Sequence, residues 1–204
     1  MTDTRPKETY HHGDLRRAII DRAADVIDAS GVEALSLRSI ARDLGVSHGA
    51  PNRHFKNKAD LLAALATEAY EQARAATVAA AEECEGGAIA KLRAMGVGYL
   101  NWALDHRALF TALNHPDVKR SADSELLKSM RAFQLTVRDA SIAAQGEGRY
   151  PGVDEKLLAL YNNSVPFGAA LLVDHPVFAA EIDHLSRDEL IEGLMTLVVP
   201  IPNE

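Results

Sequence analysis

Apolar residues recur along almost the whole chain at intervals of three and four positions, the spacing of one face of an α-helix. No stretch alternates apolar and polar residues as a β-strand does, and no repeat or low-complexity run interrupts the pattern. The pattern therefore predicts an all-α protein. The expected helices cover residues 14–30, 37–44, 48–55, 57–85, 89–106, 107–113, 127–146, 157–172 and 186–198.

Capping residues stand at several ends of these segments. Asn57 is a good N-cap, and Asp60 three residues later favours the positive end of a helix dipole. Ser186 and Glu189 have the spacing of a capping box. The double glycine at 86–87 follows a long alanine-rich segment and is expected to act as a hinge or elbow of the domain. Capping chemistry thus supports the boundaries that the periodicity predicts.

Two short predicted helices, 37–44 and 48–55, are joined by Gly45-Val46-Ser47. Glycine adopts a left-handed backbone at little cost, so Gly45 can end the first helix and turn the chain sharply. Ser47 can then cap the second helix. Two helices around such a turn form a helix-turn-helix, whose second helix enters the major groove of DNA. The segment therefore predicts DNA binding.

The order of residues in this region is specific. It reads LRxIAxxLGVS over 37–47, RHF over 53–55 and NKxxLL over 57–62. This order resembles the DNA-binding domain of the tetracycline-repressor (TetR) family, and the resemblance covers about residues 9–65. It implies a flexible arm over 1–12, a helix-turn-helix domain over 13–57, and a linker helix with a helical ligand-binding and dimerisation bundle over 58–204.

Two positions depart from the family pattern. Pro51 and Asn52 stand where members commonly carry a leucine and a tyrosine in the recognition helix. Because Pro51 lies about four residues past the Ser47 cap, we expect it to remove only the first intrahelical hydrogen bond and to leave the helix intact. Asn52 can still donate to a phosphate or pair with the edge of an adenine.

The TetR resemblance also implies which residues meet DNA. Residues 48–50 would face the bases, and Arg38 would reach a guanine edge or a phosphate. Asn52, His54 and Lys58 would lie near phosphates, although His54 could equally pack against the first helix. The predicted DNA-binding residues are Arg38, Ser47, His48, Gly49, Ala50, Asn52, Arg53, His54 and Lys58.

The charge of the chain divides between these two parts. The 204 residues carry a net charge of −7, which by itself argues against DNA binding. Residues 1–60 hold ten Lys/Arg against nine Asp/Glu, whereas residues 61–204 hold twelve against twenty. The acidity therefore belongs to the body, and the basic residues around the helix-turn-helix can still form a local patch for phosphates.

Composition narrows the setting. Cys84 is alone, so no intramolecular disulfide is possible. The sequence has neither a signal-peptide core near its first residues nor a membrane-length apolar stretch, which predicts a cytoplasmic protein without a membrane partner.

The body is expected to hold a small-molecule effector of apolar or aromatic character. The TetR resemblance places the pocket between the helices at 89–106, 127–146 and 157–172. Candidate lining residues are Tyr99, Trp102, His106, Phe110, Met130, Phe133, Gln134, Tyr161 and Asn162. The last two predicted helices carry more apolar surface than a small bundle needs, and small residues at 168–170 permit close approach. We therefore expect a homodimer that binds double-stranded DNA at a palindromic operator.

No catalytic residue, metal site or cofactor is predicted. One spacing typical of metal ligands is present, Glu181-x-x-His184. Di-iron bundles use two such motifs with further glutamates, whereas the motif occurs once here. No phosphate-binding loop or nucleophile motif is present. The sequence thus favours a ligand-released repressor over two alternatives: a constitutive DNA-binding factor without an inducer, and a helical-bundle ligand-binding or di-iron protein.

Overall fold

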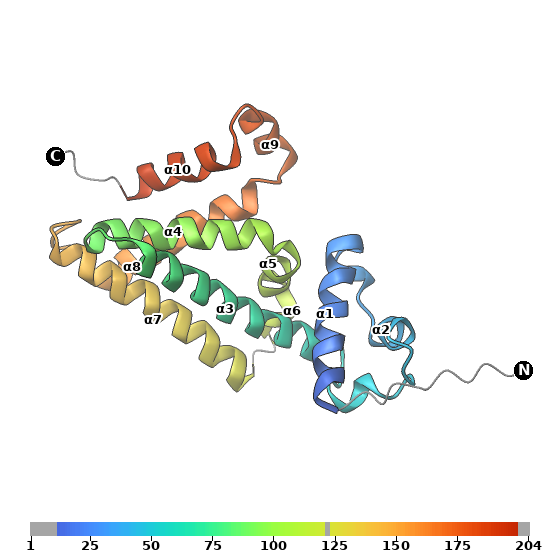
Figure 1. Ribbon diagram of the computed structural model, residues 1–204. Helices are drawn as coiled ribbons and strands as arrows, with labels where there is room; N and C mark the ends of the chain where they lie inside the picture. Colours follow the sequence, from blue (N-terminus) through green and yellow to red (C-terminus); the bar gives the residue numbers. More distant parts are fainter. Residues whose placement is uncertain (1–11, 121–122, 200–204) are drawn as a thin grey trace, which may run out of the picture.

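The computed structural model describes residues 12–120 and 123–199 of the chain, and these form an all-helical protein (Figure 1). The predicted all-α class is confirmed, with no strand among the described residues. The α-helices are α1 (His12–Ser30), α2 (Leu37–Asp43), α3 (Lys58–Glu83), α4 (Ala88–Asp105), α5 (Arg107–Asn114), α6 (Pro116–Arg120), α7 (Ser124–Gly146), α8 (Glu155–Leu172), α9 (Pro176–Ile182) and α10 (Arg187–Val198). Two 3-10 turns, η1 (Val32–Ala34) and η2 (Pro51–Arg53), flank α2.

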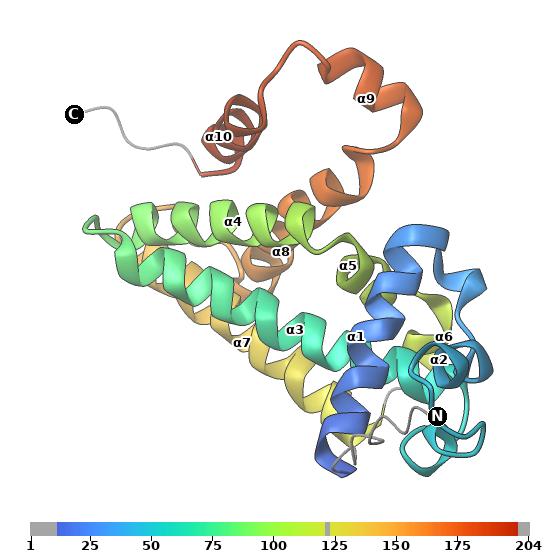
Figure 2. The same ribbon diagram turned by 45° about the vertical axis from the view of Figure 1, so that its right-hand side comes forward.

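The molecule has a small head and a larger body (Figures 1 and 2). The head consists of α1, α2, the two 3-10 turns and the beginning of α3, and α1 crosses the start of α3. Ile19 and Ile40 are fully buried where α1 meets α2, and Phe55 is buried with them. The head therefore has its own apolar core.

Helix α3 connects the head to the body. Its first turns bury Leu61, Leu62 and Leu65 in the head core, and its later turns bury small residues such as Ala73 against the body. Small side chains bring α4 close: a Cβ at Gly98 would lie 2.7 Å from the carbonyl oxygen of Ala76 in α3. One continuous helix thus belongs to both parts.

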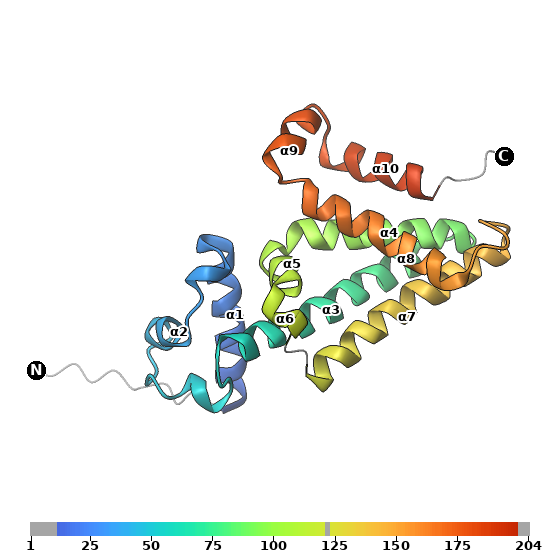
Figure 3. The same cartoon turned by 180° about the vertical axis from the view of Figure 1, so that it is seen from behind.

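The body is a bundle of α3, α4, α7 and α8, with α10 lying over α4 (Figures 1 and 3). Helix α10 buries Ile191, Met195 and Val198. Met195 packs so closely that a Cβ on Gly96 of α4 would collide with its sulfur. The apolar face predicted for the last helix is therefore largely covered by the body of the same chain.

Two of the predicted helix caps are confirmed, whereas Ser47 caps no helix, because the next helical turn, η2, begins only after Ala50. The Asn57 side chain accepts from the backbone N–H of Asp60 at 2.9 Å, and Ser186 with Glu189 forms the capping box of α10. The sequence does not reveal how α4 begins. Its first N–H groups donate to the carboxylate of Glu147, which lies 2.7 Å from the nitrogen of Ala88, and these bonds hold the pKa of Glu147 below its usual value.

Two short helices, α6 and α9, are absent from the helices that the sequence predicts. Both begin at a proline, Pro116 and Pro176. The first helical position needs no N–H donor, and proline already has the required φ, so the residue starts these helices. Pro166 lies inside α8, which continues past it to Leu172. Of the predicted arm, residues 1–11 lie outside the described ranges and His12 begins α1.

Candidate nucleic-acid interface and internal cavity

The turn after α2 has the geometry that the sequence predicts. Gly45 has φ of +66°, and its N–H donates to the carbonyl of Arg42 at 3.1 Å. The next N–H, that of Val46, reaches back to Ala41 at 3.0 Å. The chain therefore reverses after α2 and carries residues 47–55 across the head surface.

The predicted recognition helix over 48–55 is wrong in its geometry. Residues 48–50 form turns, and only η2 (Pro51–Arg53) is helical, as a 3-10 turn. Pro51 is the first residue of this turn and is fully buried. Because proline has no N–H and its ring clashes with the carbonyl of the residue four positions earlier, here Ser47, an α-helix that begins at Ser47 and runs through Pro51 is disfavoured. The expectation that Pro51 costs only one hydrogen bond underestimates this effect.

The predicted DNA-binding residues all belong to α2, the segment that follows it and the start of α3. Residues 47–49 are exposed, as are Arg38, Asn52 and Arg53, whereas Ala50 and His54 are half-buried. Lys58 is also half-buried, and its Nζ lies 3.6 Å from a carboxylate oxygen of Glu33. The backbone thus presents most of these side chains to solvent, and nothing in the head core needs them.

The cations of the head fall into two groups. Arg22 pairs with Asp43 at 2.9 Å, and this contact holds the pKa of Asp43 below its usual value. The side chains of Arg38, Arg53 and Lys56, by contrast, have no carboxylate partner among the described residues, although the backbone N–H of Lys56 donates to Asp60 at 3.0 Å. Unpaired cations on an exposed turn can neutralise phosphates without first breaking an internal ion pair.

Other cations tie the head together. Arg16 lies over the ring of Phe55 at 5.5 Å, which connects α1 to the end of the turn region. Arg17 contacts Asp21 and reaches Glu68 of α3 at 2.9 Å, and the hydrogen bond with Asp21 raises the pKa of Arg17. These two arginines therefore already have structural partners.

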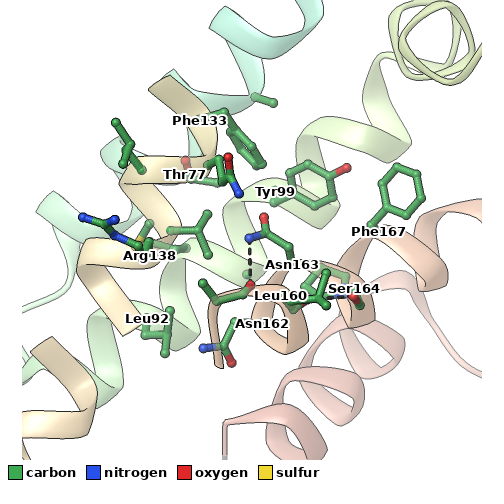
Figure 4. Close-up of a pocket in the computed structure, with 18 of the residues that line it drawn as sticks. Thr77, Leu92, Tyr99, Phe133, Arg138, Leu160, Asn162, Asn163, Ser164 and Phe167 are labelled. Carbon is green, nitrogen blue, oxygen red and sulfur yellow. Dashed lines mark hydrogen bonds between the residues drawn. The ribbon is translucent and has the colours of Figure 1, made fainter. Parts of the chain in front are cut away.

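The body encloses a cavity of about 960 Å³ between α3, α4, α7 and α8 (Figure 4). Its wall is mostly apolar, and Asn163 points into it from α8 (Figure 4). The cavity reaches the surface beside Lys156 and Leu160, two exposed residues of α8 that line it. Its size and apolar wall are typical of sites for drug-sized ligands.

The structure places five of the nine predicted pocket residues on this wall. They are Tyr99, Met130, Phe133, Gln134 and Asn162. The rings of Tyr99 and Phe133 lie 5.7 Å apart, and burial raises the pKa of the Tyr99 hydroxyl. The phenol therefore stays neutral and can donate a hydrogen bond to a ligand in the cavity.

The other four candidates lie elsewhere. Trp102 is buried in the core, donates from its indole nitrogen to Gln72 of α3 at 3.4 Å, and stacks on His106. Phe110 is buried against Phe167. Tyr161 is exposed on the outer side of α8 and makes an edge contact with Tyr150. The prediction is wrong for these four residues, because aromatic residues on apolar helix faces also belong to the core or to the surface.

Several lining residues are absent from the sequence prediction. Tyr70 and Thr77 come from α3, which the resemblance does not place at the pocket, and Phe167 and Asn163 lie within about one turn of predicted residues. Arg138 is also absent, because a charged residue on a helix is usually a solvated one. The sequence does contain one indication that Arg138 lines the cavity. It lies seven residues after Arg131 and four after Gln134, and residues at these spacings lie on the same face of a helix.

No group of three His, Cys, Asp or Glu side chains that could hold a metal ion is found among the described residues. Within the same ranges, no single helix is long and apolar enough to span a membrane. Helices α8 and α9 meet that test only as a pair, bent by 95°.

The family model for bacterial regulatory proteins of the tetR family matches residues 19–65, which include most of the head and the start of α3. The chain belongs to the tetR family. It is therefore a DNA-binding transcription regulator. The match ends within α3, and the likeness of the body to known proteins comes from solved structures.

A protein of unknown function from Rhodococcus sp. RHA1 shares 31% sequence identity with this TetR protein, with a TM-score of 0.78 over 94% of this chain and 97% of the other. A bacterial regulatory protein of the tetR family, from Rhodococcus RHA1, is 23% identical, with a TM-score of 0.66 over 90% and 96%. A TetR family transcriptional regulator from Thermus thermophilus is 20% identical, with a TM-score of 0.67 over 91% and 99%. No curated protein matches the chain in sequence. The fold thus extends over head and body together.

Proposed function

We propose that this TetR protein is a homodimeric repressor that binds a palindromic operator and releases it when a small ligand occupies the body cavity. The observation that carries the proposal is the course of α3. Its first turn begins in the head at the Asn57 cap, and Tyr70, Ala73 and Thr77 of the same helix line the cavity. A ligand that moves α3 in the body therefore moves the head.

The contact between head and body supports this coupling. Arg17 of α1 reaches Glu68 of α3, Glu68 accepts from Gln72, and Gln72 accepts from the indole of Trp102 in α4. These polar contacts connect the head to the helix that carries Tyr99 on the cavity wall. Release requires a ligand that binds more tightly to the conformation with wrongly spaced heads, because equal affinity for both conformations shifts nothing.

The outer face of α8 supports a homodimer. It carries an exposed apolar stripe at helical spacing, in which Leu157 is 59% and Leu160 63% exposed, and the stripe continues through Leu171 and Leu172. A Cβ at Gly168, on the same helix, would meet nothing within 4 Å, so a second helix has room to approach. Exposed apolar area of this extent favours association with another copy through a two-fold axis.

A large open cavity argues against the constitutive alternative, for which a collapsed body would be expected. Two identical heads related by a two-fold axis demand half-sites about one helical turn apart, roughly 34–36 Å. This spacing gives the proposal a geometric test that does not depend on knowing the ligand.

The experiment is a titration of the purified full chain against DNA fragments that flank its own gene, followed by insertion of about five base pairs between the half-sites of the bound fragment. We expect two chains per fragment, and loss of tight binding when the half-sites are rotated to opposite faces of the duplex. Binding of one chain per site that is indifferent to the insertion would overturn the dimeric, palindromic model.

A further inference from the structure

The charged residues on the cavity wall all have the same sign. Arg131, Arg138 and Lys156 line the cavity, whereas no aspartate or glutamate does so among the described residues. This imbalance runs against the composition, because residues 61–204 contain twenty acidic and only twelve basic residues. A chance sampling of the body surface would bring more carboxylates than cations to the wall. The excess of cations among the lining residues is therefore a specific feature of this site.

Arg138 is only weakly neutralised. Its nearest carboxylate contact is long, with Nη2 3.5 Å from Oδ1 of the neighbouring Asp139. Its Nε is fully buried without a hydrogen-bond partner among the described residues, so a ligand does not reach that nitrogen. The side chain as a whole is nevertheless 38% exposed, and the two terminal nitrogens of a guanidinium match the two oxygens of a carboxylate.

A second arginine adds positive charge behind the wall. Arg149 is 7% exposed, and its Nε and Nη1 have no partner in the described part of the chain. Its Nη2 donates to the side chain of Asn162 and to the carbonyl of Val198, and both acceptors belong to residues that line the cavity. Neither is a carboxylate, so the buried charge of Arg149 is not neutralised.

The rest of the wall is mostly apolar, although Thr77, Gln134, Asn162, Asn163 and Ser164 add uncharged polar groups. Aliphatic side chains and aromatic rings make up the larger share, including Leu92, Tyr99, Phe133 and Phe167 (Figure 4). Burial of an apolar chain or ring there is favourable in proportion to the area removed from water. The wall thus combines a mostly apolar surface with three cationic side chains.

We propose that the effector of this protein is an amphipathic carboxylate, whose apolar part fills the cavity and whose carboxylate pairs with Arg138. This inference rests on the proposed ligand-released function, because it names the ligand class for that same cavity. Neutral and cationic amphiphiles of equal length are therefore expected to bind more weakly than the carboxylate.

The test is isothermal titration calorimetry of the full chain, without DNA, at a pH of about 7.5, where a carboxylate is ionised. The probes are decanoate, 1-decanol and decylamine, with 6-phenylhexanoate and 6-phenylhexanol as a second, aromatic pair. Each carboxylate is expected to bind about tenfold more tightly than its alcohol, the usual gain from a charge-assisted hydrogen bond, and decylamine is expected to bind most weakly. Equal binding of acid and alcohol, preference for the amine, or no binding by either carboxylate would overturn the proposal.

Variants of Arg138 test whether this residue binds the carboxylate of the ligand. Arg138→Gln should weaken decanoate binding about tenfold and leave 1-decanol unchanged, while Arg138→Lys should restore part of the loss. Lys128→Gln is the matched control, since it removes one exposed positive charge from α7 outside the cavity wall. Equal effects on acid and alcohol would mean that Arg138 only shapes the cavity, which contradicts its proposed role.

The readout separates this inference from the proposed function. Carboxylate binding that does not release a bound operator fragment would leave the ligand class standing and contradict the release mechanism. Operator binding without any carboxylate binding would contradict the ligand class and leave the proposal of a DNA-binding repressor standing.

Discussion

The head and the body of this TetR protein differ in where the residues proposed for function lie. In the head, the residues proposed for function are mostly exposed, and the core residues Ile19, Ile40 and Phe55 only hold the surface in place. In the body, the proposed site is internal, so residues such as Tyr99 serve the cavity wall and the bundle at once. A surface site can therefore change without loss of the fold, whereas a change of the cavity wall also changes the packing.

The largest expected effect comes from breaking the outer stripe of α8. Leu157→Asp places a charge on a residue that is 59% exposed in the single chain but would be buried in the proposed dimer. We expect the chain to become monomeric at micromolar concentration and to lose at least about a hundredfold in operator affinity, because the two heads then bind separately. Analytical ultracentrifugation and DNA titration measure the two effects.

Ile142→Asp is the control for this substitution, because Ile142 is an exposed apolar residue of α7 outside the α8 stripe. It should leave both association and DNA affinity unchanged. A fully dimeric Leu157→Asp protein would show that α8 is not the interface.

Arg38→Ala should have the next largest effect. Arg38 is exposed, has no carboxylate partner among the described residues and stands in the first turn of α2, so its removal should not disturb the head core. Loss of a base or phosphate contact should cost about 1–3 kcal/mol of DNA-binding free energy per head. Fluorescence anisotropy with an operator fragment measures it, with the thermal midpoint as the control for folding, and unchanged affinity would contradict the docking of this face.

Lys58→Ala should have a smaller effect. Lys58 is half-buried and lies 3.6 Å from Glu33, so part of its charge is already engaged within the head. If Lys58 contacts a phosphate, its loss should weaken binding to all DNA sequences similarly and reduce the salt slope by about one per head. A change in sequence preference instead would place Lys58 at the bases.

The sequence predicts the head and the body to different depths. Helical periodicity identifies the core of a helix because every inward position must be apolar. Leu61, Leu65 and Met195 stand at such positions of their helices, and all three are buried. Periodicity does not separate a core residue from a cavity residue. Tyr99 and Phe110 therefore have equal standing in the sequence, although only Tyr99 lines the cavity.

Two local features are beyond the same reasoning. The cost of Pro51 depends on whether the preceding residues can form a helical turn at all, and here the chain takes a 3-10 turn that buries the ring instead. Glu147 caps α4 from 59 residues away in sequence, so no local motif could reveal it. The DNA-contact residues remain predictions, which the substitutions above test.

The smallest expected effect concerns Glu147, which stabilises the body away from both proposed sites. Backbone N–H groups of α4 hold its pKa below the usual value in the folded chain. Folding is therefore stabilised above the unfolded pKa of about 4.3, and this contribution is lost as pH falls through the folded pKa. Glu147→Gln should lower Tm slightly at about pH 7, and the difference from the original chain should shrink towards about pH 3.

Glu85→Gln is the control, because Glu85 is an exposed carboxylate just before the start of α4. The Tm of this variant should not approach that of the original chain as pH falls. Parallel Tm curves for Glu147→Gln and the original chain across that range of pH would mean that the ionised carboxylate contributes nothing to the α4 cap.

The exposed cations of the head are proposed to bind one specific DNA site, and salt dependence tests this most directly. The measurement is the affinity of the full chain for a single palindromic fragment and for a scrambled fragment of equal length, at about 50 and 200 mM salt. A dimer that neutralises roughly six to ten phosphates should lose about three to five decades of affinity between these concentrations, and should prefer the palindrome at both. Weak binding that salt hardly changes, or equal binding to both fragments, would contradict specific DNA binding by the head.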